Sequence, residues 1–129
     1  MIQSENEKTQ KIKLIMFDLD GTLVDSVPDL AFAVDAMLTE LGEPKAGNDQ
    51  VRLWVGNGAL MLVKRALSRS MQAKEIEASY LEKAMALFFD FYQKVNGRKS
   101  QLYPQVLGTL KKLRKETLYL ALVTNKPEQ

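Results

Sequence analysis

Two short apolar runs, one near each end of the chain, constrain the fold more than any other feature of the sequence. The first covers residues 12–17 and stops at Asp18, and the second covers residues 118–123 and stops at Thr124. Continuous apolar runs of this length are typical of strands that are buried on both faces of a parallel sheet. Two such strands need one shared sheet. The sequence therefore predicts an α/β fold with its chemistry at the carboxyl ends of the strands.

The sequence between the two runs has the periodicity of amphipathic helices. One helix is expected to begin at Ser26, where Ser26 and Asp29 resemble a capping box, and to stop at Gly42. Further helices are expected from about residue 49 with a break at residues 56–58, over residues 75–95, and within residues 104–115. This stretch is far longer than one crossover helix, so residues 26–100 are predicted to be an inserted helical module.

The composition removes several classes of chemistry. The 129 residues include no histidine and no cysteine, which excludes disulfides, thiolate or imidazole catalysis, and His- or Cys-ligated metals. Any catalysis must use carboxylates, hydroxyls, amines, backbone amides or a hard metal ion. The 18 Lys and Arg against 16 Asp and Glu give a net charge of +2, and the basic residues are scattered. We therefore expect no nucleic-acid partner.

The N-terminal residues are polar and point to a cytoplasmic protein. Residues 1–13 carry charges of both signs and lack the apolar core of a signal peptide. No apolar run approaches the roughly 20 residues that a membrane span requires. We therefore expect a cytoplasmic location and no membrane partner.

The segment after the first apolar run carries the candidate catalytic residues. Asp18 and Asp20 are two residues apart at the end of an extended segment, so their side chains are expected to project to the same side. Two neighbouring carboxylates repel each other and offer a site for a divalent cation. Gly21 permits a sharp turn that brings backbone amides close to a bound anion, and Thr22 adds a hydroxyl. The alternative is an ordinary Asp-Gly surface turn, which the preceding buried strand disfavours.

The string Asp-Leu-Asp-Gly-Thr-Leu at residues 18–23 resembles the first motif of the haloacid dehalogenase-like (HAD) phosphohydrolase superfamily. The resemblance implies that Asp18 is a nucleophile that forms an aspartyl-phosphate, and that Asp20 is the general acid and base. It also implies that the Asp18 carboxylate and the Asp20 backbone carbonyl ligate Mg²⁺. A cation suits this chemistry because a carboxylate nucleophile has to approach an anionic phosphate.

The end of the second apolar run resembles the second motif of this superfamily, in which a Ser or Thr follows an apolar strand. The resemblance implies that the Thr124 hydroxyl binds a phosphoryl oxygen, with Asn125 close behind it. By itself, Thr-Asn after a strand is more often a strand-ending turn. Lys126 is not assigned as the phosphate-binding lysine, because in the superfamily that lysine lies further along the chain.

The inserted module resembles a small C1-type cap, which in this superfamily closes over the site and selects substrates. Residues 25–30, 54–59 and 123–127 are similar to the bacterial phosphoglycolate phosphatases of the superfamily. The guanidinium of Arg65 could pair with a substrate carboxylate, and a solvated helix arginine is an equally good interpretation.

These resemblances divide the chain into three parts. Residues 1–25 are expected to begin a doubly wound parallel-sheet core, residues 26–100 to form the cap, and residues 101–129 to return to the core. The implied reaction is Mg²⁺-dependent hydrolysis of a small phosphomonoester, and the resemblance favours 2-phosphoglycolate as the substrate. The third-motif lysine and the fourth-motif acidic pair of the superfamily are missing from this incomplete core. The 129 residues alone are therefore expected to be inactive or nearly so.

Two alternatives remain open. One is a related member with a similar cap, such as a sugar-phosphate phosphatase or a β-phosphoglucomutase. A haloacid dehalogenase proper is less favoured, because dehalogenases lack the acid and base that Asp20 supplies. The other alternative is a non-catalytic binding fragment whose exposed sheet edge is completed by a partner chain or by self-association.

Overall fold

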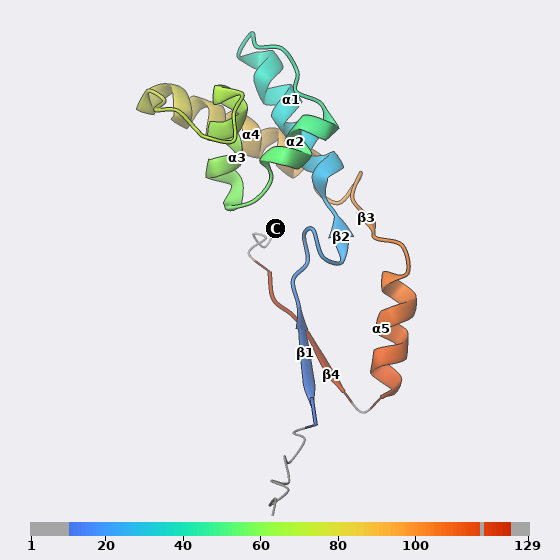
Figure 1. The fold of residues 1–129 in the computed structure, drawn as a ribbon. Coiled ribbons are helices and arrows are strands. Elements are labelled where there is room, and N and C mark those ends of the chain that lie inside the picture. Colours follow the sequence, from blue (N-terminus) through green and yellow to red (C-terminus); the bar gives the residue numbers. More distant parts are fainter. Residues whose placement is uncertain (1–10, 117, 125–129) are drawn as a thin grey trace, which may run out of the picture.

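The structure is a computed structural model that describes residues 11–116 and 118–124. Helices α1 to α4 gather at one end of the molecule, and a two-stranded parallel sheet with α5 beside it lies at the other (Figure 1). The elements in chain order are β1 (Leu14–Phe17), β2 (Val24–Asp25), α1 (Val27–Glu40), α2 (Asn48–Trp54), α3 (Gly58–Ser68), α4 (Ala78–Val95), β3 (Gln101–Leu102), α5 (Val106–Lys115) and β4 (Tyr119–Leu122).

Helices α1 to α4, which we call the helical unit, enclose the hydrophobic core. Each helix contributes large side chains that are almost completely buried, among them Met37 and Leu38 of α1, Trp54 of α2, Val63 of α3 and Phe88 of α4. Helices α1 and α4 form the most extensive helix pair. Among the described residues, no helix is long and apolar enough to cross a membrane.

Local signals set most of the helix ends where the sequence predicts them. Helix α1 stops before Gly42, which has a φ of 76°. The predicted break between α2 and α3 is present, and residues 56–58 all have positive φ there. Helix α4 begins later than expected, at Ala78, because the Glu77 side chain accepts backbone N–H groups of the first turn and caps the helix at that point.

The predicted capping box at the start of α1 is wrong. Ser26 is the N-cap residue, but its side chain makes no capping hydrogen bond with any described residue. Asp29 is fully buried, and its carboxylate accepts the backbone N–H groups of Gly97 (2.9 Å), Lys99 (2.8 Å) and Ser100 (3.2 Å), and the Ser100 hydroxyl. Asp29 therefore ties the first turn of α1 to the segment that follows α4. The sequence around Asp29 does not indicate this contact.

The two apolar runs form the parallel pair β1 and β4, as the sequence predicts. Leu14 lies opposite Tyr119, and Phe17 lies opposite Leu122. The expectation that both faces are buried is wrong for the described residues, since Met16 is 65% exposed and Tyr119 is 75% exposed. Two strands cannot cover their own faces, and none of the described side chains of α5 is buried.

A short antiparallel ribbon, which no sequence pattern predicts, connects the sheet to the helical unit. Val24 of β2 lies opposite Leu102 of β3, and Asp25 lies opposite Gln101. Strands of two residues are too short to produce a period-two pattern. The ribbon lies where the chain passes from the sheet into the helices and returns (Figure 1). The division into residues 1–25, 26–100 and 101–129 stays a prediction.

Candidate active site

The parallel register brings the ends of β1 and β4 together. The Val123 backbone N–H donates to the Phe17 carbonyl at 2.8 Å, which extends the ladder one step past β4. Asp18 directly follows β1, and Thr124 follows Val123 at the end of β4, so both lie at the same edge of the sheet. This is the edge that points toward the helical unit in Figure 1. Two predicted site residues from opposite ends of the sequence are therefore neighbours in the fold.

A tight turn follows Asp18 and is held by backbone hydrogen bonds. The Leu19 carbonyl accepts N–H groups from Thr22 (3.2 Å), Leu23 (2.9 Å) and Val24 (3.1 Å), and the Gly21 N–H donates to the Val24 carbonyl (2.9 Å). Gly21 has a φ of 78°, and a Cβ placed there would meet nothing within 4 Å. Glycine is therefore required here by backbone conformation and not by lack of space.

The acidic residues of the turn differ in their surroundings. Asp18 is exposed, and its Oδ1 accepts the N–H of Leu19 at 2.8 Å. Asp20 is half-buried and forms an isolated bridge with Val24. The Thr22 and Thr124 side chains are exposed. Asn125, which was also predicted to lie at the site, falls outside the described residues.

The oxygen donors of this turn fit a partial Mg²⁺ shell. Mg²⁺ prefers oxygen ligands, keeps several waters, and is commonly bound by one or two carboxylates together with substrate phosphate. The Asp18 carboxylate and the Asp20 backbone carbonyl are donors of this kind. In the part of the chain that the structure describes, no group of three or more acidic side chains could hold a metal ion. The turn therefore offers some of the ligands that Mg²⁺ needs.

Arg65 is held inside the helical unit. Its Nη1 donates to the carbonyls of Trp54 (2.8 Å) and Gly56 (3.1 Å), its Nη2 to Oδ1 of Asn57 (3.1 Å), and its Nε to the carbonyl of Met71 (3.2 Å). These bonds use four of the five N–H donors of a guanidinium. Because the residue is only 9% exposed, the interpretation as a solvated helix arginine is wrong. Its pairing with a substrate carboxylate stays a prediction.

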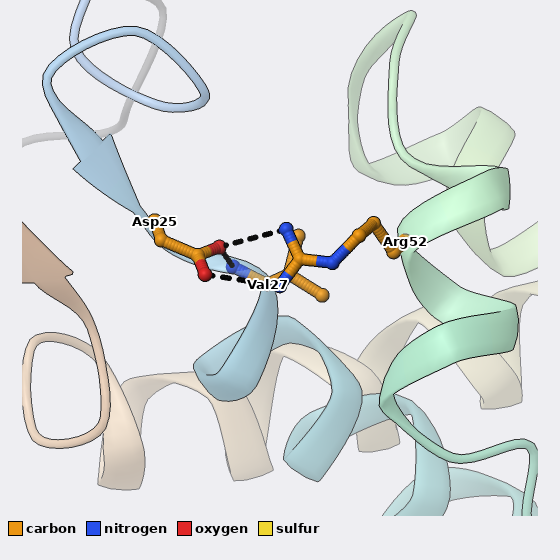
Figure 2. A network of polar contacts seen from close by, with 3 residues as sticks. All are labelled: Asp25, Val27 and Arg52. Atoms are coloured by element: carbon orange, nitrogen blue, oxygen red, sulfur yellow. Dashed lines mark hydrogen bonds and ion pairs between the residues drawn. The ribbon is translucent and has the colours of Figure 1, made fainter. Parts of the chain in front are cut away.

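An ion pair links the ribbon to the helical unit. Arg52 of α2 donates from Nη1 to Oδ1 of Asp25 (3.1 Å) and from Nη2 to Oδ2 (2.9 Å), and the Val27 N–H donates to the same Oδ1 (3.3 Å) (Figure 2). The hydrogen bonds from Arg52 hold the pKa of Asp25 below its ordinary value. The partners are far apart in the sequence, so no short-range pattern announces this contact.

Comparisons with known proteins agree with the motifs. The model of a family described as haloacid dehalogenase-like hydrolase matches residues 15–129. The phosphoglycolate phosphatase of Pseudomonas putida is 53% identical over 117 residues, which cover 91% of this chain and 43% of that relative. The phosphoglycolate phosphatase of Psychrobacter arcticus is 51% identical, with 89% of this chain and 51% of the relative covered. The chain thus spans about half the length of these curated relatives, or less.

Solved structures share the fold. A crystal structure from Haemophilus somnus, described as a predicted phosphoglycolate phosphatase, has a TM-score of 0.78 and 39% identity, and covers 92% of this chain and 54% of its own. A haloacid dehalogenase-like family hydrolase from Streptococcus pneumoniae has a TM-score of 0.70 and 26% identity, with coverages of 89% and 50%. The predicted α/β class with an incomplete parallel-sheet core is confirmed. This chain belongs to the haloacid dehalogenase-like hydrolase family, as the motif at residues 18–23 indicates.

Proposed function

We propose that these residues serve the Mg²⁺-dependent hydrolysis of a small phosphomonoester, 2-phosphoglycolate, through an aspartyl-phosphate. The observation that carries the proposal is the parallel register that brings Asp18 and Thr124 to one edge of the sheet. A nucleophile and a phosphate-binding hydroxyl have to lie together for this reaction. The names of the relatives in Pseudomonas putida and Psychrobacter arcticus support the choice of substrate.

The two aspartates divide the chemistry between them. In the first step a carboxylate oxygen of Asp18 attacks phosphorus, and the bond to the leaving alkoxide breaks as the Asp20 carboxyl donates a proton to that oxygen. In the second step the Asp20 carboxylate takes a proton from a water, which attacks phosphorus and releases phosphate and the Asp18 carboxylate. When bound by the Asp18 carboxylate and the Asp20 carbonyl, Mg²⁺ offsets the repulsion between carboxylate and phosphate.

The neighbouring groups hold the phosphoryl group in place. The Thr124 hydroxyl donates to one phosphoryl oxygen, and Asn125 lies next along the chain. The positive φ of Gly21 permits the tight turn that follows Asp18, and the Thr22 hydroxyl adds a further donor. Arg65 acts on the connection between α2 and α3, because most of its donors already bind that connection and the segment after α3.

We expect the 129 residues alone to hydrolyse 2-phosphoglycolate slowly or not at all. The described residues supply part of a Mg²⁺ shell, and transition-state charge in phosphoryl transfer needs further cationic groups. Purified chain with Mg²⁺ and 2-phosphoglycolate provides the test, with released phosphate as the readout. Turnover at rates ordinary for phosphatases would show that this part of the proposal is wrong.

A chimera tests the reaction itself. Residues 1–129 are joined to the remaining C-terminal part of the Pseudomonas putida relative, and hydrolysis of 2-phosphoglycolate, sugar phosphates and β-glucose 1-phosphate is measured with and without Mg²⁺. We expect Mg²⁺-dependent release of phosphate, highest with 2-phosphoglycolate, and a loss of about a thousandfold or more in Asp18→Asn. Glu82→Gln, on the exposed side of α4, is the matched control. Full activity in a folded Asp18→Asn chimera rules out the proposed nucleophile.

The sheet supports a second proposal, self-association of this chain. Apolar side chains of β1 and β4 are exposed, among them Leu14, Met16, Tyr119 and Leu122. Strands with unpaired edges and exposed apolar faces favour pairing with another chain. Sedimentation velocity over a range of concentrations measures this directly. A monomer at every concentration contradicts self-association.

A further inference from the structure

Arg52 reaches from the helical unit to the ribbon. It lies in the last turn of α2, and its guanidinium makes the two parallel hydrogen bonds with Asp25 of β2 that are drawn in Figure 2. Paired bonds of this kind define the relative orientation of the two groups as well as their separation. Arg52 therefore constrains the angle at which the chain enters the helical unit.

The two connections between the sheet and the helical unit are hydrogen-bonded to each other. Tyr103 directly follows β3, and its backbone N–H donates to the Leu23 carbonyl just before β2 at 3.0 Å. The pKa of Arg52 is raised mainly by its hydrogen bonds to Asp25, and Tyr103 contributes in the same direction. Arg52 therefore binds the outgoing connection, and that connection is itself hydrogen-bonded to the returning one.

Other contacts hold the helices and the sheet separately. Helices α1 to α4 pack chiefly against one another, and β1 packs against β4. The buried carboxylate of Asp29 ties the segment after α4 to α1, which secures the helical end of the return. Arg52 instead acts between these two regions, where it constrains the angle between the ribbon and α2.

We propose that Arg52 is a positioning residue that, through Asp25, holds the helical unit at one angle to the sheet edge carrying Asp18 and Thr124. The consequence for catalysis rests on the proposed function, whereas the angle itself does not. The pair lies partly in solvent, so its loss changes orientation without unfolding the helices.

Because the chain contains no cysteine, two introduced cysteines can be spin-labelled selectively, and the distance between them reports the angle. Spin labels are attached to Lys83→Cys in α4 and Tyr119→Cys in β4, two exposed positions, and the distance distribution is recorded by pulsed electron paramagnetic resonance. We expect one narrow distribution in the parent. In Arg52→Ala, the fraction of molecules whose label-to-label distance falls outside the parent distribution should rise about fivefold. Arg52→Lys keeps the charge but lacks the planar guanidinium, so its rise should be smaller.

A variant in which Asp25 and Arg52 exchange their charges shows whether the ion pair itself, and not mutation at either position, sets the angle. The double variant Asp25→Arg with Arg52→Asp should narrow the distribution again, while each single substitution broadens it. In about 1 M salt the parent should broaden and Arg52→Ala should not change, because exposed ion pairs are screened. Lys94→Ala, which removes an exposed ion pair within α4, should leave the distribution unchanged.

Two results overturn the proposal. One is an unchanged distribution in an Arg52→Ala variant whose circular dichroism shows that the helices are folded. The other is a distance distribution in the double variant that is as broad as in the single variants. The measurement does not depend on turnover, and Asp18→Asn should leave the distribution as it is in the parent. A failure of the proposed phosphatase activity is therefore distinguishable from a failure of this inference.

Discussion

The helical unit and the sheet are held together in different ways. In the helical unit, large side chains from all four helices are buried against one another. In the sheet region, β1 and β4 leave much of their apolar surface exposed, and order comes from backbone hydrogen bonds of the parallel ladder and of the turn after Asp18. The candidate catalytic residues lie in the second region. Their placement therefore depends on backbone geometry and register more than on side-chain packing.

The largest expected effect separates the two regions by stability. Phe88 is 1% exposed in the core of the helical unit, and Phe88→Ala should lower the free energy of unfolding by about 3–5 kcal/mol. Phe89, its neighbour in α4, is 36% exposed, and Phe89→Ala should cost about 1 kcal/mol or less. Urea unfolding followed by circular dichroism measures both. Equal losses would mean that the core is not where the structure shows it.

Removal of Asp29 tests the junction between the helices and the returning chain. Asp29→Ala removes a fully buried carboxylate and leaves the partly buried N–H groups of Gly97, Lys99 and Ser100 without their acceptor, and should cost about 3 kcal/mol. Asp49→Ala, which removes an exposed acid in the first turn of α2, should cost about 0.5 kcal/mol. Hydrogen exchange should be faster at residues 97–100 in the first variant only. Unchanged exchange there argues against the role assigned to Asp29.

Two glycines of the sheet region should respond in opposite directions. Gly21 has a φ of 78°, so Gly21→Ala should destabilise by about 1–2 kcal/mol despite the open space around it. Gly108 lies in α5 with ordinary helical geometry and equally open space, so Gly108→Ala should stabilise by about 0.5–1 kcal/mol. Thermal unfolding of the two variants checks the sign. Two effects of the same sign would contradict the assigned turn conformation.

The smallest expected effect is a pH dependence of the pair between the two regions. Arg52 lowers the pKa of Asp25, so the folded state holds this carboxylate ionised at pH values where the unfolded chain takes up a proton. The stabilisation is present above the pKa that Asp has in an unfolded chain, about 3.8, and is lost as pH falls through the lower folded pKa. Its size should be at most about 1 kcal/mol. Unfolding free energies of the parent and Arg52→Gln should therefore converge in acid, and parallel curves would contradict the pair.

Much of the fold follows from short-range patterns. The strands β1 and β4, the helix stop at Gly42 and the break at residues 56–58 are visible because periodicity and glycine conformation act over a few residues. The motif at residues 18–23 by itself also indicates the family. The contacts of Asp29 and Arg52 could not be predicted, because their partners lie far along the chain. The ribbon could not be predicted either, because strands of two residues are too short to form a pattern.

The sequence by itself determined the chemical inventory: carboxylates and hydroxyls without imidazole or thiol, placed directly after two strands. The tertiary structure decided which of these groups meet. It brought Asp18 beside Thr124 through a parallel register, buried Asp29 against the return from α4, and turned Arg65 inward to four protein acceptors. The physical reason is range. Propensities and turns act between near neighbours, whereas register, burial and ion pairing depend on residues that only the folded chain brings together.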